Sequence, residues 1–320
     1  MRIALLDDYQ DVARSSADWG SLPAGTEVVA FHDHLEDEAA LAERLRDFEV
    51  VVGVRGRLAF TRSLLERLPN LKLFMSGGGQ SPQLDLAAAT DLGITVCTLR
   101  GVNSATAELS WALMLALARQ IPQSDRDVRE GRWQQTIGVS MERKTLGLVG
   151  LGNLGGQVAK VARAFGMNVI AWSRNLTPER AEEHGATAVT KDELFQRADF
   201  IDVHVPLTDE STGLVGAHEL ALMKPTAYIV NTSRGPLVDE RALAEVLREH
   251  RIAGAGVDVF DIEPLPADHP FLALDNIIMT PHLGFVTRES HALFYRDAVE
   301  NIAAFMAGSP VRVAQVRAGH

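Results

Sequence analysis

The chain has 320 residues, enough for about two domains of ordinary size. Its hydrophobic content of 46% is that of a globular protein, and its net charge of −11 argues against nucleic acid or an anionic membrane as a main partner. No apolar run reaches the roughly 20 residues of a membrane span. The single cysteine, Cys97, excludes an intrachain disulfide framework and a thiolate metal cluster, so we expect a cytoplasmic protein. The ten histidines show no ligand spacing beside acids or cysteines, so no metal site is expected.

Short β-branched runs alternate with amphipathic stretches, which is typical of parallel sheets covered by helices. The chain starts with a charged segment, Met1–Asp8, which indicates a first strand rather than a signal peptide. The strands predicted in the first part of the chain are Arg2–Leu6, Glu27–Phe31, Val50–Val54, Leu71–Met75 and Ile94–Cys97, and the helices are Glu38–Asp47 and Thr61–Arg67, with Thr61 as a helix cap.

A second set of strands begins near the middle of the chain. Before it lies the helix Glu108–Arg119, which is apolar nearly all round and therefore buried on several sides, between two domains or two subunits. The polar segment Gln123–Glu142 is expected to be an excursion between the two sets. The strands of the second set are Leu146–Val149, Asn168–Trp172, Phe200–Val203, Ala227–Val230, Gly254–Val259 and Asn276–Met279, and a last helix follows at Arg288–Met306. The pattern predicts an α/β protein with two doubly wound parallel-sheet domains, the second inserted into the first.

A glycine turn, Gly150-Leu151-Gly152-Asn153-Leu154-Gly155, stands between the strand Leu146–Val149 and a predicted helix, Gln157–Phe165. In this context the first glycine permits a tight turn, the second lets the backbone approach a pyrophosphate, and the third lets helix and strand pack closely. The N–H groups of the first helical turn then meet the phosphates. The alternative is a glycine-rich turn without a ligand, and the flanking strand and helix favour the dinucleotide site.

The end of the next strand bears on the choice of cofactor. An NAD enzyme usually carries an acid there to bind the ribose hydroxyls, but this chain has Ser173-Arg174-Asn175. Arg174 can bind a 2′-phosphate with charge-assisted hydrogen bonds, and Ser173 can add another. We therefore expect NADP(H) to be preferred, with NAD(H) as the alternative if Arg174 is only a solvated loop residue.

Polar side chains follow three later strands, at the sheet edge where α/β proteins bind ligands. Arg234 lies in Asn231–Gly235, Glu263 in Gly254–Pro264, and His282 in Thr280–Gly284. Reduction of a 2-keto acid requires a proton donor with a pKa near working pH, a carboxylate that favours its charged form, and a cation for the substrate carboxylate. Each residue alone is more often structural, but together they supply all three groups.

The chain resembles the D-isomer-specific 2-hydroxyacid dehydrogenase family. The residues that carry the resemblance are Gly150–Gly155, Asn231–Gly235 with Leu237–Glu240, Gly254–Pro264 and Thr280–Gly284. It implies that Arg234 binds and polarises the substrate and that His282, paired with Glu263, is the general acid/base. It also implies a flavodoxin-like substrate domain at 1–99 and 289–320, a Rossmann domain at 100–288, and a homodimer formed through the region of the long apolar helix.

The resemblance extends to the cofactor contacts. Asp258 resembles the aspartate that contacts the nicotinamide carboxamide, and Thr106 resembles a residue near the same ring. The other expected contacts are Gly150, Gly152, Asn153, Leu154, Gly155, Ser173, Arg174, Asn175, Val205, Thr232 and Ser233.

The substrate-side loop, Met75–Asp85, departs from the family pattern. The backbone N–H groups of Gly78, Gly79 and Gln80 can still form a nest for a carboxylate, and the alternative is a flexible turn. The departure puts the identity of the substrate in question more than the reaction. Glyoxylate and hydroxypyruvate are the leading candidates.

Other functions remain open at this point. A phosphite dehydrogenase shares the Arg/Glu/His set, and a phosphoglycerate dehydrogenase is an alternative although no regulatory domain is expected after His320. A formate dehydrogenase is disfavoured because that branch has glutamine in place of Glu263. From a different class, dinucleotide-sensing corepressors resemble this fold, and turnover of a 2-keto acid would separate an enzyme from such a sensor.

Overall fold

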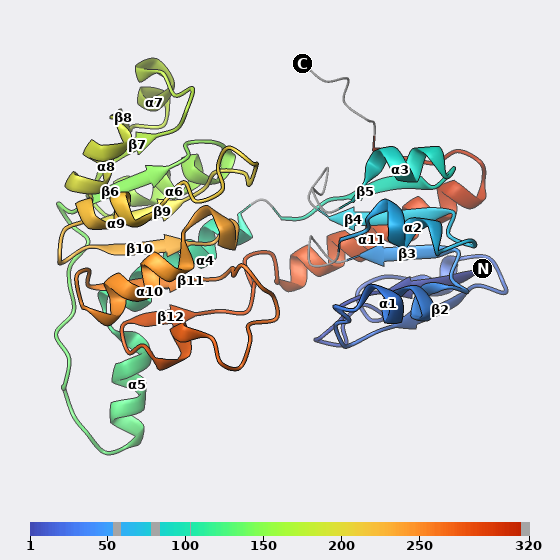
Figure 1. The fold of residues 1–320 in the computed structure, drawn as a ribbon, viewed down its shortest axis with the longest axis horizontal. Helices are drawn as coiled ribbons and strands as arrows, with labels where there is room; N and C mark the ends of the chain where they lie inside the picture. Colours follow the sequence, from blue (N-terminus) through green and yellow to red (C-terminus); the bar gives the residue numbers. More distant parts are fainter. Residues whose placement is uncertain (54–58, 78–83, 103, 315–320) are drawn as a thin grey trace. The chain divides into compact units, whose positions relative to one another are not determined.

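A computed structural model describes residues 1–53, 59–77, 84–102 and 104–314. The chain forms two compact units, Met1–Val102 with Val286–His320, and Asn103–Phe285. Each unit contains one parallel sheet covered by helices on both faces (Figure 1). The predicted fold class is therefore confirmed.

The first unit has five strands in the order β2-β1-β3-β4-β5, which is the flavodoxin-like order. Ile3 of the central strand pairs with Val28 on one side and Val50 on the other, and both pairings are parallel. The strands are β1 (Arg2–Leu5), β2 (Glu27–Ala30), β3 (Val50–Gly53), β4 (Leu73–Gly77) and β5 (Thr95–Leu99).

Alternate residues of these strands face two separate hydrophobic cores. Ala4 and Val51 pack against α1 (Glu38–Leu45), α2 (Arg62–Glu66) and α3 (Leu86–Asp91). On the other face, Ile3, Leu5, Val50 and Val52 pack against the returning helix α11 (Arg288–Met306). The buried carboxylate of Asp297 on α11 binds the Arg100 guanidinium at 2.6 and 2.9 Å, which ties the last helix to the segment after β5.

The second unit has seven strands in the order β12-β11-β10-β9-β6-β7-β8. They are β6 (Thr145–Val149), β7 (Asn168–Trp172), β8 (Thr187–Ala188), β9 (Phe200–Val203), β10 (Tyr228–Asn231), β11 (Gly254–Val257) and β12 (Ile277–Met279). The chain runs outward from β6 to β8 and then returns to pair β9 with β6. This topological switch point is where open α/β sheets bind ligands, beyond the carboxyl ends of the strands.

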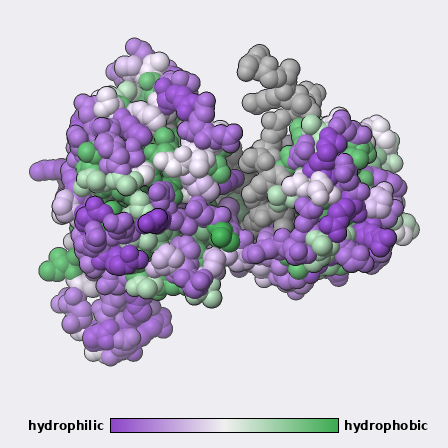
Figure 2. Space-filling model, viewed as in Figure 1, coloured by the Kyte–Doolittle hydropathy of each residue, from purple (hydrophilic) through white to green (hydrophobic). Residues whose placement is uncertain are grey.

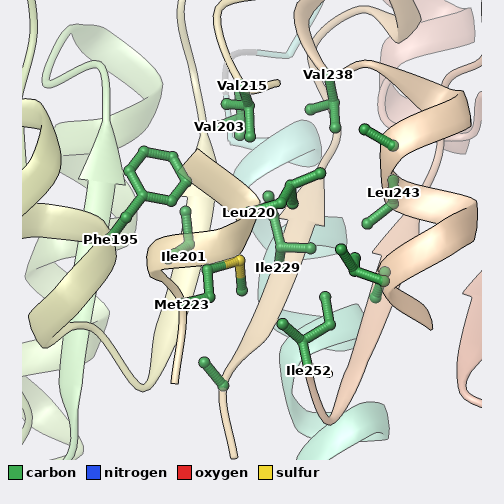
Figure 3. Packing of buried hydrophobic residues seen from close by; sticks show 14 of the residues in the cluster. Phe195, Ile201, Val203, Val215, Leu220, Met223, Ile229, Val238, Leu243 and Ile252 are labelled. Carbon is green, nitrogen blue, oxygen red and sulfur yellow. The ribbon is translucent and has the colours of Figure 1, made fainter. Parts of the chain in front are cut away.

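Helices cover both faces of this sheet. Figure 3 shows one core, in which Phe195, Ile201, Leu220, Ile229 and Leu243 interdigitate between strands and helices. These helices are α8 (Lys191–Arg197), α9 (Ala217–Leu222) and α10 (Glu240–Arg248). On the opposite face lie α4 (Ala105–Ala118), α6 (Asn153–Ala164) and α7 (Pro178–Glu183).

Two helices differ from the sequence-based prediction. The helix after the glycine turn begins at Asn153 rather than Gln157, and the apolar helix α4 begins at Ala105 rather than Glu108. The prediction starts α6 too late because glycine has a low helix propensity. In the structure, the close contact of Gly155 with Gly150 overrides that propensity.

A further helix, α5 (Ile121–Arg129), lies where a polar excursion was expected. Pro122 occupies its first turn, where proline is favoured, and Asp125 and Arg129 form an i,i+4 ion pair. The surface over α5, at the lower left, is predominantly hydrophilic (Figure 2). Four apolar side chains in and after this helix are nevertheless exposed: Ile121, Val128, Trp133 and Ile137. Among the described residues, no helix has the length and apolar character to cross a membrane.

Candidate active site

The glycine turn connects β6 to α6, and its three glycines have three different surroundings. Gly150 has a φ of +103°, and a Cβ there would lie 2.7 Å from the carbonyl oxygen of His204. A Cβ at Gly155 would lie 2.3 Å from the carbonyl oxygen of Gly150, so only glycine permits this approach of helix to strand. A Cβ at Gly152 would meet no atom within 4 Å, which leaves space for a ligand beside the backbone.

The first turn of α6 has the features of an anion-binding site. The helix begins at Asn153 and includes Leu154 and Gly155, so their N–H groups have no partner within the helix. The cap position is Gly152, which has no side chain to accept these hydrogen bonds. Residues 152–155 therefore offer the donors and the positive end of the helix dipole that a pyrophosphate requires.

The end of β7 lies next to this turn, because the N–H of Gly150 donates to the carbonyl oxygen of Trp172 at 2.8 Å. Ser173, Arg174 and Asn175 follow directly, and the carbonyl oxygen of Ser173 closes the turn by accepting from Leu176. Arg174 is exposed and forms an ion pair with Glu210, which is also exposed. This ion pair holds the guanidinium at the surface, beside the position where an NAD enzyme usually carries an acid.

The residues after β9 and β10 complete the expected cofactor surface. Val205 contacts the turn, since a Cβ at Gly150 would lie 2.9 Å from its Cγ1. Thr232 is buried, with its hydroxyl 2.7 Å from that of Ser110 on α4. Ser233 donates from its hydroxyl to the carbonyl oxygen of Val203 at 2.9 Å, which joins the ends of β9 and β10. The structure thus places these predicted contacts along one edge of one sheet.

Arg234 follows immediately in an extended conformation, with φ −147° and ψ 142°. Its Nη1 donates to the carbonyl oxygen of Ser233 at 2.6 Å, and Asn231 donates to the carbonyl oxygen of Arg234 at 2.8 Å. Burial lowers the pKa of the Arg234 guanidinium, and the negative charge of Glu263 opposes that effect. A partly desolvated cation close to a carboxylate is well suited to binding a substrate carboxylate.

The structure brings Glu263 and His282 into direct contact. The Nδ1 of His282 donates to Oε2 of Glu263 at 2.6 Å, and the two side chains are 12% and 17% exposed. The other carboxylate oxygen of Glu263 accepts from the N–H of Phe260 at 2.9 Å. This geometry fixes the imidazole ring, and it leaves Nε2 as the nitrogen that can exchange a proton with a substrate.

Asp258 fixes the turn Thr280–Gly284, which carries His282 and is called the His282 turn below. The sequence did not suggest this role. Its buried carboxylate accepts hydrogen bonds from the hydroxyl of Thr280 at 2.6 Å and from the N–H groups of Leu283 and Gly284 at 2.7 and 2.8 Å. Burial raises the pKa of Asp258, while these three donors favour its ionised form. His282, at the centre of the turn, has a φ of +56°, which this network stabilises.

Thr106 belongs to the same network. Its hydroxyl donates to the carbonyl oxygen of Gly284 at 3.0 Å, so α4 contacts the turn that carries His282. A Cβ at Gly284 would lie 3.2 Å from Asp258 and 3.3 Å from Thr106, which explains the glycine at this position. The predicted substrate contacts Gly78, Gly79 and Gln80 lie outside the described residues.

One buried pair near the glycine turn escaped the sequence analysis. Asp202 and His204 have fully buried side chains, and Nε2 of His204 lies 2.8 Å from a carboxylate oxygen of Asp202. The N–H of His204 donates to the carbonyl oxygen of Val149, directly before the turn. An Asp-x-His sequence at the end of a strand is the signal that would have drawn attention to it.

A possible cation site was likewise not expected. Ligand atoms of Asp8, Asp11 and His32 in the first unit lie within 4.8 Å of one another. However, the carboxylate of Asp8 already accepts from the N–H groups of Val12 and Ala13, and Asp11 and His32 are exposed. These hydrogen bonds and the exposure of two of the three residues account for the cluster without a bound cation.

Known proteins are similar to this chain in both sequence and structure. Residues 111–284 match the family described as "D-isomer specific 2-hydroxyacid dehydrogenase, NAD binding domain". The glyoxylate reductase of Aeropyrum pernix is 41% identical over 77% of this chain and 76% of its own length. The phosphoglycerate oxidoreductase of Vibrio cholerae, a solved structure, has a TM-score of 0.91 at 37% identity over 97% of this chain and 100% of its own.

A longer relative is similar too. The D-3-phosphoglycerate dehydrogenase of Methanocaldococcus jannaschii is 42% identical over 84% of this chain, but the match covers 52% of that protein. The chain therefore spans about half the length of this relative.

Proposed function

Because the chain belongs to the D-isomer specific 2-hydroxyacid dehydrogenase family, we propose that it transfers a hydride between a nicotinamide dinucleotide and a small 2-keto acid or its D-2-hydroxy acid. The observation that carries this proposal is the contact of 2.6 Å between His282 and Glu263, with Arg234 close to the same carboxylate. All three residues lie in the unit that contains the glycine turn.

The proposed chemistry assigns one task to each residue. A bound dinucleotide supplies the hydride that adds to C2 of the keto acid. Nε2 of His282 donates a proton to the carbonyl oxygen as that oxygen gains negative charge. Glu263 holds the imidazole ring through its Nδ1, and Arg234 binds the substrate carboxylate and polarises the carbonyl group. The product is the 2-hydroxy acid, and His282 is left neutral.

The residues of the second unit fit a dinucleotide, and we propose that NADP(H) is preferred. Gly152 and the first turn of α6 would hold the pyrophosphate, and Ser173 with Arg174 would bind a 2′-phosphate. Glu210 now pairs with Arg174, so a phosphate would replace this exposed carboxylate as the partner of the guanidinium. NAD(H) has no 2′-phosphate, so the ion pair would stay intact and Arg174 would make no additional contact with the cofactor.

Glyoxylate and hydroxypyruvate remain the proposed substrates. The similar glyoxylate reductase is matched over most of its length, whereas the phosphoglycerate dehydrogenase is matched over about half of its length. A phosphorylated 2-hydroxy acid is the second candidate substrate, because one relative is named a D-3-phosphoglycerate dehydrogenase and one solved structure a phosphoglycerate oxidoreductase. We place the reaction in the cytoplasm, since the one thiol, Cys97, is buried and the chain needs no oxidising compartment.

We also propose a homodimer. The family resemblance implies dimerisation through the region of the apolar helix α4, and four exposed apolar side chains follow that helix in and after α5: Ile121, Val128, Trp133 and Ile137. Sedimentation of the wild type should give twice the mass of the chain. Replacement of Trp133 and Ile137 by serine should shift the equilibrium toward monomer.

A steady-state screen tests the proposed reaction. NADPH and NADH are each offered with glyoxylate, hydroxypyruvate, 3-phosphohydroxypyruvate and larger 2-keto acids, and oxidation is followed at 340 nm. We expect turnover of the small, unphosphorylated acids. Tight dinucleotide binding without turnover of any acid would instead favour a dinucleotide sensor.

A further inference from the structure

The motif Leu237–Glu240, singled out in the sequence, leads to a second glutamate–histidine pair. Asp239 caps α10 by accepting from the N–H of Ala242 at 3.0 Å. Glu240, the first residue of the helix, instead reaches the loop after β11. Its Oε1 accepts from the N–H of Asp261 at 2.9 Å, and its Oε2 accepts from Nε2 of His269 at 3.1 Å. The Glu240 and His269 side chains are only 15% and 12% exposed.

The surroundings of His269 fix its ring. Its Nδ1 accepts from the N–H of Phe271 at 3.3 Å, so Nε2 carries the proton that is donated to Glu240. Edge contacts with Phe260 and Phe271, at centroid distances of 6.3 and 4.7 Å, hold the ring plane. Both oxygens of Glu240 therefore have partners that cannot easily turn away.

The segment 260–263 also contacts the backbone of Gly235. A Cβ at Gly235 would lie 2.1 Å from the carbonyl carbon of Phe260 and 2.5 Å from the nitrogen of Asp261, so the two backbones are in van der Waals contact. Gly235 is the neighbour of Arg234. Phe260, in turn, donates its N–H to the carboxylate of Glu263, which also accepts a hydrogen bond from Nδ1 of His282. The loop thus contacts Gly235 and Glu240 at Phe260 and Asp261, two to three residues before it presents Glu263.

We propose that Glu240, fixed by His269, is a positioning residue for Glu263 and, through it, for the ring of His282. This inference rests on the proposed roles of Glu263 and His282. The hydrogen bond from Asp261 to Glu240 holds the loop against Gly235, and the fixed loop keeps Oε2 of Glu263 within reach of Nδ1. A misplacement of a catalytic group by about 1 Å can lower the rate by roughly a hundredfold.

The test compares four variants of the full chain: Glu240→Ala, Glu240→Gln, His269→Gln and the control Glu245→Gln. Glu245 is exposed on the same helix. Turnover is measured with NADPH and glyoxylate. The Nδ1 proton of His282, assigned with His282→Asn, is followed by NMR, because a short hydrogen bond to Glu263 moves it downfield.

We expect Glu240→Ala to lower kcat by roughly tenfold or more, to leave KM for the dinucleotide unchanged, and to move the Nδ1 proton upfield. Glu240→Gln should lower kcat less than Glu240→Ala does, because its amide oxygen still accepts from Asp261 while its NH₂ group faces the Nε2–H of His269. His269→Gln should have an intermediate effect, and it replaces Glu240→Ala as the deciding variant if that protein does not fold. The control should match the wild type.

A fall in melting temperature with an unmoved Nδ1 proton and unchanged kcat would overturn the proposal, because it would leave Glu240 a purely structural role. Failure of the proposed function has a different signature. If His282→Asn retained full turnover, the catalytic assignment would be wrong, while the NMR comparison of the Glu240 variants would still show whether the loop positions His282.

Discussion

The two ends of the second sheet that serve the proposed reaction are built in opposite ways. Beyond β11 and β12, the functional groups are tied down by buried partners: Asp258 accepts three hydrogen bonds, and Glu263 contacts both His282 and Phe260. Beyond β7, Arg174 is exposed and has one exposed partner, Glu210. Exposed ion pairs contribute little free energy and are easily exchanged, whereas buried networks fix geometry.

This difference teaches that reaction and cofactor choice are separable in this molecule. The proton-transfer groups need positions fixed to within fractions of an ångström, which only a buried network supplies. Discrimination between NADP(H) and NAD(H) needs one charge near the ribose, and it can therefore depend on one surface side chain. Substitutions in the first region should change the rate for both cofactors, and those in the second should change only their ratio.

The largest effect is expected from His282→Asn. Asparagine cannot exchange a proton at neutral pH, so kcat should fall by about 10²- to 10⁴-fold with NADPH and NADH alike. Dinucleotide affinity, measured by fluorescence titration, should stay near that of the wild type. A loss of affinity equal to the loss of rate would mean that the turn, rather than proton transfer, had been damaged.

Asp258→Asn should have the next largest effect. The amide keeps one acceptor oxygen but turns an NH₂ group toward a backbone donor, which costs about 1–3 kcal/mol in the free energy of unfolding. The His282 turn should loosen, and kcat should fall by about tenfold with both cofactors. Urea unfolding and steady-state kinetics measure the two effects. Thr280→Ser is the matched control, because it retains the hydroxyl that Asp258 accepts from.

Arg174→Ala should change the cofactor ratio alone. Loss of a charge-assisted hydrogen bond to a 2′-phosphate should lower kcat/KM for NADPH by about tenfold and leave that for NADH unchanged. Glu210→Gln should act in the opposite direction, because it frees the guanidinium for the phosphate. Equal kcat/KM ratios in wild type and both variants would show that Arg174 does not select the cofactor.

The regular elements were largely predictable because their signals are local. Asn168–Trp172, Phe200–Val203 and Arg288–Met306 have the bounds expected from β-branched runs and from helical periodicity. The start of α6 was not predictable from propensity, since it depends on the packing of Gly155 against Gly150. The helix α5 was missed because its sequence is polar and its stability comes from a proline and side-chain pairs rather than a buried face.

The candidate site shows the same division. Arg234, Glu263 and His282 could be proposed because each follows a strand of one sheet, and the carboxyl ends of parallel strands meet at one edge. The bonds from Asp258 to the His282 turn and from Glu240 to the loop of Glu263 could not be proposed. They join residues 21 to 26 positions apart through particular side-chain conformations, which no sequence spacing encodes.

The smallest effect should appear at Asp261, the exposed counterpart of Asp258 in the same loop. Although the residue is exposed, partial desolvation of its carboxylate and the charges of Glu240 and Asp239 raise its pKa to about 6 from an ordinary 3.8. The folded state therefore takes up a proton between about pH 4 and 6, and the stability contributed by this uptake is lost as the pH rises through 6.

Asp261→Asn removes the repulsion and retains the backbone N–H from which Glu240 accepts a hydrogen bond. Its melting temperature should exceed that of the wild type at pH 8 and equal it near pH 4, whereas the exposed control Asp268→Asn should show no such dependence. An equal difference in melting temperature at both pH values would mean that the neighbouring carboxylates do not repel Asp261 and do not raise its pKa.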